Sequence, residues 1–258
     1  MKHIYKFSIV LLTVFTFIGC NVDDDDSVTV LPMKELTASL SQQVDVIRIA
    51  DDATSYDLVI NFSEALPSYS TIEYSLDGGA TTTSSASSGD NTLVIPIAFD
   101  EDKFYRDVVL SDFIVVNAAA RRFSTSITGN SSLRIARQGT IFAAPGSVEI
   151  TVTWSDSSKD LDIFLIEGNQ DLDGTVLDDS QGVTTTEQVV LSADEEGVFS
   201  LFMYEWNFDY PVDYEINYVF EDGQVLSFDS NITSDSFQFT MSKSNDGAQM
   251  ICYINKIE

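Results

Sequence analysis

The sequence predicts an all-β protein with two β-sandwich domains in tandem, behind an N-terminal signal segment and an acidic tether. Apolar and polar residues alternate in many short runs, which is the two-residue period of half-buried strands. Clusters of Gly, Asp, Asn and Ser separate these runs, and no long stretch shows the 3.6-residue period of a helix. The remaining chain has room for two domains of about 100 residues each, an ordinary size for a β-sandwich.

Residues 1–19 have the composition of a secretory signal. Lys2 and Lys6 stand before and beside an apolar run at 7–18, and the small residue Gly19 follows the run. This run is shorter than the ~20 apolar residues that a membrane-spanning helix needs. We therefore expect a cleaved signal, with an uncleaved membrane anchor as the alternative.

The four residues Phe17, Ile18, Gly19 and Cys20 resemble the bacterial lipobox, in which the cysteine thiol is lipidated and becomes the new N-terminus. The resemblance implies a lipoprotein signal at 1–19 and a lipid anchor on Cys20, with more than one acyl chain for stable attachment. Phe17 and Ile18 depart from the usual Leu and Ala or Ser.

Residues 20–33 form the expected tether, with consecutive aspartates at 23–26 that must be solvated. An acidic run behind the lipidated cysteine resembles that of Bacteroidetes-type surface lipoproteins. This resemblance implies an outer membrane lipoprotein exposed on the cell surface. The alternative is that the acidic run is only a flexible tether. In that case the sequence does not distinguish the cell surface from the periplasmic face of the membrane.

The composition excludes several classes of function. The chain has 41 acidic and 13 basic residues and a net charge of −28, so we expect no nucleic acid partner, since phosphates require Lys and Arg. The single histidine is His3, inside the signal, which excludes histidine-based catalysis and metal ligation in the mature chain. With Cys20 lipidated, Cys252 has no intrachain disulfide partner, and its apolar strand predicts a buried thiol.

Residues 34–143 are expected to form the first sandwich. Its alternating runs lie at 56–62, 72–76, 93–99, 108–116 and 123–127. Asp77 and Gly78 supply the positive φ angles of a tight hairpin turn. Pro96 has no N–H to donate, which predicts an edge strand. The stretches at 56–62, 72–81 and 93–97 resemble Calx-beta and immunoglobulin-like sandwiches, and the resemblance implies the fold without assigning ligand residues.

The sequence Ala143-Ala144-Pro145-Gly146 marks the expected domain boundary, and the charge changes there. Residues 34–145 hold 14 acidic and 8 basic residues, and residues 146–258 hold 23 acidic and 3 basic residues. Four arginines lie shortly before this boundary, namely Arg121, Arg122, Arg134 and Arg137. They either face the acidic second domain or form an ordinary solvated patch.

Residues 146–258 are expected to form the second sandwich, with Trp154 on the inward face of its first strand. The sequence has a Trp-ending strand at 148–154, an Asp-Leu-Asp strand at 160–166, an apolar strand entered by Gly197 and a Tyr-led strand at 214–218. This order resembles the bacterial pre-peptidase C-terminal domain, a jelly-roll-like sandwich. The resemblance implies an accessory domain, often calcium-stabilised, that in some members binds collagen or glycans. Asp222 and Gly223 predict a further hairpin.

Oxygen-bearing side chains alternate in the segment 169–174. Asn169, Asp171 and Asp173, followed by Gly174, match the first half of an EF-hand calcium loop. The twelfth position, which is Glu in an EF-hand loop, is Ser180 here, and Asp179 precedes it.

A second arrangement of cation ligands combines Asp156, Asp160 and Asp162 near the end of a strand. The alternative for all these acids is a solvated loop face. We therefore expect calcium, if bound, as a structural cofactor in the second domain.

Four aromatic residues gather at 204–210 among acidic and amide side chains, namely Tyr204, Trp206, Phe208 and Tyr210. Flat apolar rings beside polar acceptors are typical of a sugar-binding platform, so these residues are the candidate ligand site. Packing in the core or between domains is the alternative.

Taken together, these observations favour a non-catalytic binding or adhesion module for a glycan or a protein, displayed on the cell surface and held by its N-terminal lipid. The first alternative is a structural or accessory subunit of an outer-membrane uptake or secretion complex. A hydrolase that uses two carboxylates is a second alternative. Because the chain holds 41 acidic residues, its sequence singles out no particular pair for this role.

Overall fold

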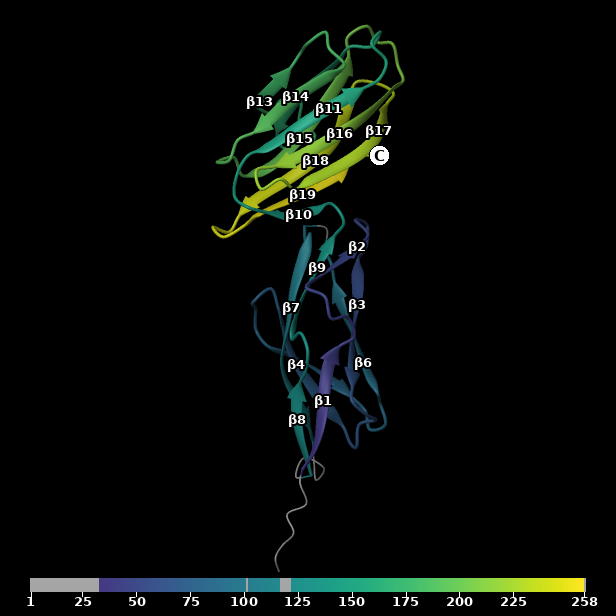
Figure 1. Ribbon diagram of the computed structural model, residues 1–258, viewed down its shortest axis with the longest axis vertical. Helices are drawn as coiled ribbons and strands as arrows, with labels where there is room; N and C mark the ends of the chain where they lie inside the picture. Colours follow the sequence, from purple (N-terminus) through teal and green to yellow (C-terminus); the bar gives the residue numbers. More distant parts are fainter. Residues whose placement is uncertain (1–32, 101, 117–121, 258) are drawn as a thin grey trace, which may run out of the picture.

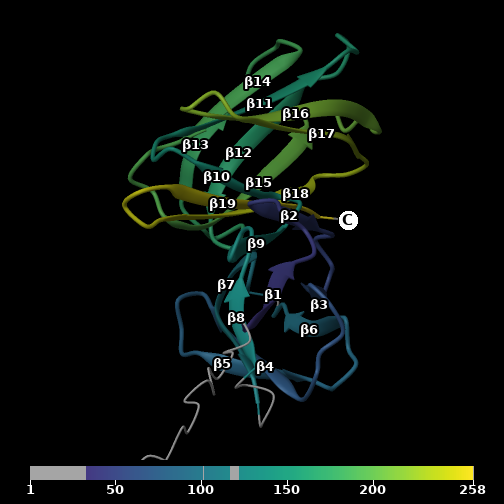
Figure 2. The same ribbon diagram turned by 60° about the horizontal axis from the view of Figure 1, so that its bottom comes forward.

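The computed structural model describes residues 33–100, 102–116 and 122–257. Every regular element in these ranges is a β-strand, and no helix there is long and apolar enough to cross a membrane. The strands form two sandwiches stacked along the longest axis of the molecule (Figures 1 and 2). The all-β tandem prediction is therefore confirmed. The signal at 1–19, Cys20 and nearly all of the tether lie outside the described residues.

The first domain packs a four-stranded sheet, ordered β6-β3-β1-β8, against a five-stranded sheet, ordered β2-β9-β7-β4-β5. Its strands are β1 (Lys34–Leu40), β2 (Val46–Ile49), β3 (Ser55–Phe62), β4 (Ser70–Leu76), β5 (Thr82–Ala86), β6 (Thr92–Ala98), β7 (Tyr105–Val115), β8 (Phe123–Ile127) and β9 (Ser132–Arg137). The pairs β1–β8 and β2–β9 are parallel, and the other pairs are antiparallel.

Local sequence explains these elements. In β3 the alternation buries Leu58, Ile60 and Phe62 against the facing sheet. Asp77 (φ 52°) and Gly78 (φ 68°) form the turn between β4 and β5, as predicted. Pro96 lies in β6, which is an edge strand, again as predicted.

The second domain packs a six-stranded sheet, ordered β10-β19-β18-β15-β12-β13, against a four-stranded sheet, ordered β14-β11-β16-β17. Its strands are β10 (Thr140–Ala143), β11 (Val148–Trp154), β12 (Leu161–Glu167), β13 (Val176–Ser180), β14 (Thr186–Leu191), β15 (Gly197–Glu205), β16 (Val212–Phe220), β17 (Val225–Ile232), β18 (Ser236–Asn245) and β19 (Met250–Lys256). All its pairs are antiparallel.

The second domain has its own apolar core between the two sheets. Trp154 and the thiol of Cys252 are buried in this core, as the sequence predicted. Burial raises the pKa of Cys252 to about 12, so the thiol stays protonated at neutral pH. The hairpin predicted at Asp222 and Gly223 joins β16 to β17, with Gly223 at φ 86°.

The chain passes from one sandwich to the other at Gly139, earlier than the composition indicated. β10 pairs with the C-terminal strand β19, in register from Thr140 opposite Tyr253 to Ala143 opposite Met250. The expected range 34–143 for the first domain included this strand. The pairing places it in a sheet of the second domain, before the boundary expected at 143–146.

Aromatic and basic side chains join the two domains. Arg134 of β9 contacts the ring of Phe142 in β10, and Phe104 stacks on Tyr253 with 4.2 Å between ring centroids. Arg137 is buried and donates to the carbonyls of Lys103 and Asp100. Of the arginines expected near the boundary, Arg134 faces the second domain, and Arg137 is buried against backbone carbonyls of the first domain. Arg121 lies outside the described residues.

The first described strand starts far from the second domain. β1 begins at Lys34, beside Phe123 of β8, at the end of the first sandwich opposite the join (Figure 1). The N-terminal attachment and the second domain therefore lie at opposite ends of the long axis.

Candidate functional site

The outer face of the six-stranded sheet carries a group of aromatic side chains. Along β12 and β15 the residues Ile163, Leu165, Leu201 and Met203 point into the core. Their neighbours in sequence point to the opposite face, because successive side chains of a strand alternate. These outward neighbours are aromatic and only half-buried, namely Phe164, Phe202 and Tyr204.

Strand pairing brings these rings together. Phe164 of β12 lies opposite Phe202 of β15, which in turn lies opposite Phe237 of β18. The rings of Phe164 and Tyr204 are nearly parallel at 15°, with centroids 5.8 Å apart, and Tyr204 lies 6.2 Å from Trp206. Phe202 and Phe237 pack edge to face at 5.3 Å. We call these five side chains, Phe164, Phe202, Tyr204, Trp206 and Phe237, the aromatic face.

Trp206 and Phe208 lie in the loop after β15 and are the most exposed aromatic rings of this region. Trp206 is 60% exposed and Phe208 is 71% exposed. Large apolar side chains are seldom left in water in a contiguous group unless the surface binds something. The exposure therefore makes this end of the second domain the candidate binding surface.

A buried carboxylate holds the Trp206 loop in place. Glu205 is fully buried, and it accepts hydrogen bonds from the backbone N–H groups of Asp160 (3.3 Å) and Asp209 (2.6 Å). Lys159 closes the loop from outside, through the carbonyl and the carboxylate of Asp209, both at 2.6 Å. The backbone N–H of Trp206 also donates to the carbonyl of Asp160. The exposed rings are thus presented by a fixed backbone.

Tyr210 supports the loop instead of extending the aromatic face. Its ring packs against the core of the second domain. Its hydroxyl donates to Asp235 and accepts the N–H of Glu205. Burial and the bond to Asp235 raise the pKa of Tyr210 to about 12. Of the four aromatic residues singled out in the sequence, Tyr204 and Trp206 belong to the aromatic face and Tyr210 does not.

Acidic side chains border the aromatic face. Asp162 points to the same side of β12 as Phe164, lies opposite Tyr204 and is almost fully buried. Burial raises the pKa of Asp162, and the nearby carboxylates of Asp160, Glu187 and Asp179 raise it further. The hydrogen bond from the Tyr204 hydroxyl has the opposite effect and lowers this pKa. Burial and the bond to Asp162 raise the pKa of Tyr204 to about 12.

The structure does not assemble the calcium loop that the spacing suggested. Asp171 turns back on its own loop and accepts the N–H of Asp173 (3.0 Å), so its carboxylate caps a turn. Asp179 lies in β13 and accepts from Gln181. Nowhere in the described ranges do three or more acidic, Cys or His side chains converge to hold a metal ion. Asn169 lies in the same loop, after β12.

The alternative cation site is not assembled either. Asp156 is exposed and accepts from the N–H and the hydroxyl of Ser158. Asp162 lies in β12 under Tyr204, and one carboxylate oxygen of Asp160 is buried without a hydrogen-bond partner. These three acids therefore do not form a ligand set.

A hollow of about 450 Å³ adjoins the aromatic face. Phe202 and Phe237 line it on the sheet side, and Asp235, Gln238 and Asn231 supply polar groups. Small-molecule and sugar sites combine apolar surface with a few placed polar groups in this way.

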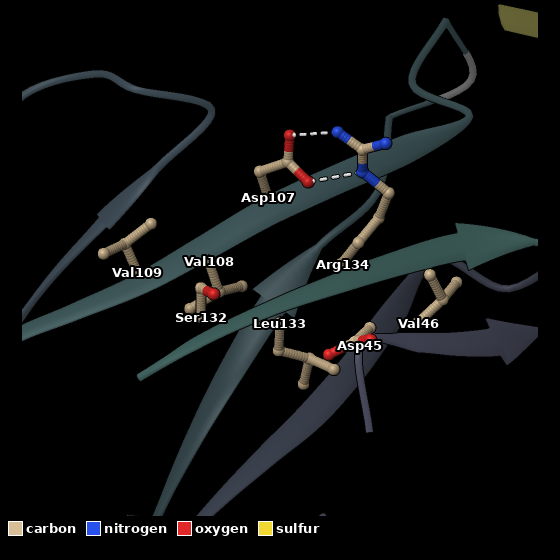
Figure 3. A pocket seen from close by; sticks show the side chains of 8 residues that line it. All are labelled: Asp45, Val46, Asp107, Val108, Val109, Ser132, Leu133 and Arg134. Atoms are coloured by element: carbon tan, nitrogen blue, oxygen red, sulfur yellow. Dashed lines mark hydrogen bonds and ion pairs between the residues drawn. The ribbon is translucent and has the colours of Figure 1, made fainter. Parts of the chain in front are cut away.

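A second hollow of about 450 Å³ lies on the first domain, close to the join (Figure 3). Its charged element is Arg134, which forms a two-bond ion pair with Asp107 at 2.6 and 2.8 Å. The arginine is already engaged by this carboxylate and by the neighbouring rings, so the hollow offers a ligand little unpaired polarity.

Phe164, Phe202 and Phe237 were missed at the level of sequence. Phe164 and Phe202 lie at outward positions of strands whose inward positions are apolar, and an aromatic residue at a position expected to be wet is a usable signal. Phe237 alternates in sequence with the buried Phe239 and Met241, and only a register shift between β15 and β18 places it opposite Phe202. Their grouping depends on the register of β12, β15 and β18, which the sequence does not state.

No known protein-family model matches the chain, and no curated protein sequence matches it. Among solved structures, the CBD12 domain pair of CALX1.2 aligns with 72% of this chain and 83% of its own at 12% identity and a TM-score of 0.31. The calcium-binding domain CBD12 of CALX1.1 covers 64% and 79% at 12% identity and a TM-score of 0.28. The apo-form Calx CBD1 domain covers 40% and 97% at 10% identity and a TM-score of 0.29. Likeness this distant carries no argument about ligands, so the architecture rests on the strand pairing above.

Proposed function

We propose that this protein is a non-catalytic, lipid-anchored binding module of the cell surface that captures carbohydrate through the aromatic face of its second domain. The observation that carries the proposal is the group of neighbouring rings on the outer sheet face, next to a polar hollow: Phe164 stacks on Tyr204, and Trp206 packs against Tyr204 at a tilt of 38°. Pyranose rings present flat C–H faces that pack on aromatic rings, while their hydroxyls need acceptors such as carboxylates and amides.

The buried acids support a binding role over a hydrolytic one. Glycoside hydrolysis needs two carboxyl groups that reach the substrate from both sides of the scissile bond. The Glu205 carboxylate accepts hydrogen bonds from two backbone N–H groups. The Glu187 carboxylate accepts hydrogen bonds from the N–H of Gly182 and the hydroxyl of Ser180. Both serve as internal caps for loops.

The shape of the molecule supports display at the cell surface. With Cys20 lipidated, the membrane would adjoin the Lys34 end of the first domain. The aromatic face would then lie in the distal domain, away from the bilayer (Figure 1). This arrangement suits capture of material from outside the cell.

The carbohydrate role is tested with the full-length protein and an immobilised panel of poly- and oligosaccharides. Trp206→Ala should weaken binding at least about tenfold, since stacking on an exposed ring of this size contributes more than 1 kcal/mol. Tyr69→Ala is the matched control, because Tyr69 is an exposed aromatic residue of the first domain. Equal affinities of Trp206→Ala and the parent protein would contradict the proposed site.

If the aromatic face instead serves an accessory subunit, the panel would give no binding. Trp206→Ala would then release a protein that copurifies from the outer membrane, which makes this outcome distinct from a carbohydrate role.

The anchor is tested separately. Cys20→Ala should move the protein from the membrane fraction to the soluble fraction, whereas Cys252→Ala, which changes the other cysteine, should leave it membrane-bound. Protease treatment of intact cells then distinguishes the outer surface from the periplasm. A Cys20→Ala protein that stays in the membrane would overturn the lipid anchor.

A further inference from the structure

A larger hollow continues the binding surface toward the first domain. It has a volume of about 730 Å³ and shares Gln170 and Ile257 with the hollow beside the aromatic face. Tyr253 and Asn255 of β19 line it, and Asp52 from the turn between β2 and β3 adds a group from the other domain. The two hollows therefore adjoin each other on the same side of the molecule.

Gln170 is fixed where the two hollows meet. It adopts the left-handed conformation at φ 55°, and its N–H donates to the hydroxyl of Ser200 (2.8 Å). The Ser200 hydroxyl in turn donates to the carbonyl of Gly168 (2.8 Å). Ile257 is tied on the other side by a bond from its N–H to the carbonyl of Gln238. The path between the hollows is thus bordered by ordered groups.

The chemistry along this path is aromatic, amide, hydroxyl and carboxylate. Aromatic rings line both hollows, with Phe202 and Phe237 in the first and Tyr253 in the second, while Asp235 and Asp52 add one negative charge to each. Among the residues that the structure describes, Lys256 is the one basic residue that lines either hollow, and its amine donates to the carbonyl of Asp229. Like charges repel at this range, so an acidic polymer would be disfavoured along the path.

We propose that the ligand is an uncharged, linear polysaccharide that runs from the aromatic face past Gln170 and Ile257 to the first domain. This inference rests on the proposed function and adds the class of ligand and its course over the surface. Sugar units near Trp206 would stack on rings, and units farther along would lie in the second hollow against Asn255 and Asp52.

The inference predicts that affinity grows with chain length and falls when the far hollow is filled. Full-length protein is measured against neutral glucans, mannan and xylan, their oligosaccharides of two to eight units, and the acidic polymers alginate and polygalacturonate. Asn255→Trp places a large side chain in the far hollow from an exposed strand position. We expect it to weaken binding of the long neutral polymer about tenfold and to leave the shortest bound oligosaccharide unchanged.

Two further variants keep the test decisive. Asp52→Trp fills the same hollow from the first domain, from an exposed turn, and covers the case in which Asn255→Trp does not fold. Gln188→Trp is the matched control, because Gln188 is exposed on β14 in the opposite sheet and should not alter binding.

The outcomes distinguish failure of this inference from failure of the proposed function on which it rests. Preferred binding of alginate or polygalacturonate, affinity independent of length, or full binding by both filled variants would overturn the course and ligand class while the carbohydrate role stands. Failure to bind any carbohydrate would overturn the proposed function itself.

Discussion

The guanidinium carbon of Arg134, in the first domain, lies 4.4 Å from the ring centroid of Phe142, in the second. The same cation lies 5.0 Å from the ring of Tyr105 and is held by both oxygens of Asp107. A planar guanidinium can stack on rings while its N–H groups bind a carboxylate, which a lysine cannot do as well. Arg134 therefore links the two sandwiches, alongside the stack of Phe104 on Tyr253.

Replacing Arg134 should loosen the join between the domains. Arg134→Met keeps much of the apolar stem but removes the ion pair and the cation–π contacts, and should lower the free energy of unfolding by about 1–2 kcal/mol. Calorimetry should resolve two transitions where the parent protein shows one. Lys103→Met, which removes an exposed cation of the same domain, should leave the profile unchanged. A single unshifted transition for Arg134→Met would show that the join does not depend on this residue.

Gly139 should tolerate no side chain. A Cβ atom at this position would lie 2.1 Å from the backbone carbonyl oxygen of Ile254, which cannot move without disturbing β19. We expect Gly139→Ala to cost about 1–3 kcal/mol, the usual range for overpacking. Urea unfolding measures the loss, with Gln138→Ala, at the exposed neighbour, as the control. Equal midpoints for the two variants would contradict the close approach.

Glu205 should be required for the order of the Trp206 loop. Glu205→Ala leaves the N–H groups of Asp160 and Asp209 without their acceptor, which should cost about 2–3 kcal/mol and increase proteolysis within the loop. Glu205→Gln keeps one carbonyl acceptor in the same place and should cost less. Thermal unfolding and limited proteolysis give both quantities. If Glu205→Gln proved as damaging as Glu205→Ala, the negative charge itself would be the requirement.

Asp162 should make the protein less stable as the pH rises. Burial raises its pKa in the folded state, so the folded protein binds this proton more tightly than the unfolded chain does. The resulting stabilisation is present below about pH 4, near the ordinary carboxyl pKa, and is lost as the pH rises through the raised value. Asp162→Asn removes this titration, so its free energy of unfolding relative to the parent protein should increase between pH 4 and pH 7.

Urea titrations across this range test the Asp162 prediction. Asp194→Asn, which changes an exposed carboxylate in the loop before β15, is the control. A constant difference between Asp162→Asn and the parent protein at all pH values would contradict the burial of this charge.

Much of the fold could be predicted because its signals are local. Alternation in residues 148–154 defines β11 and places Trp154 in the core, and the missing N–H of Pro96 defines an edge. The turn at Asp77 and Gly78 follows from the positive φ angles that it requires. Each of these predictions uses only residues that are neighbours in the chain.

The parts that could not be predicted depend on distant pairing. The aromatic face exists because Phe202 lies between Phe164 and Phe237, which come from strands far apart in sequence. The true crossing at Gly139 depends on β10 pairing with the last strand, whereas composition pointed to Pro145 and Gly146. The acids of the calcium spacing are not gathered in the described part of the chain, where Asp171 accepts the N–H of Asp173 within its own turn.

The pairing of β1 also determines how the molecule would respond to mechanical force. β1 begins at the end opposite the second domain and runs along the long axis, bonded to β3 on one side and β8 on the other (Figure 1). A particle held by the distal domain would pull against the N-terminus along this strand. Ladder hydrogen bonds lie across the strand direction, so such a pull would shear all of them together instead of opening them one by one. The same pairing that closes the first sheet would thus let a single strand transmit tension to the rest of the molecule.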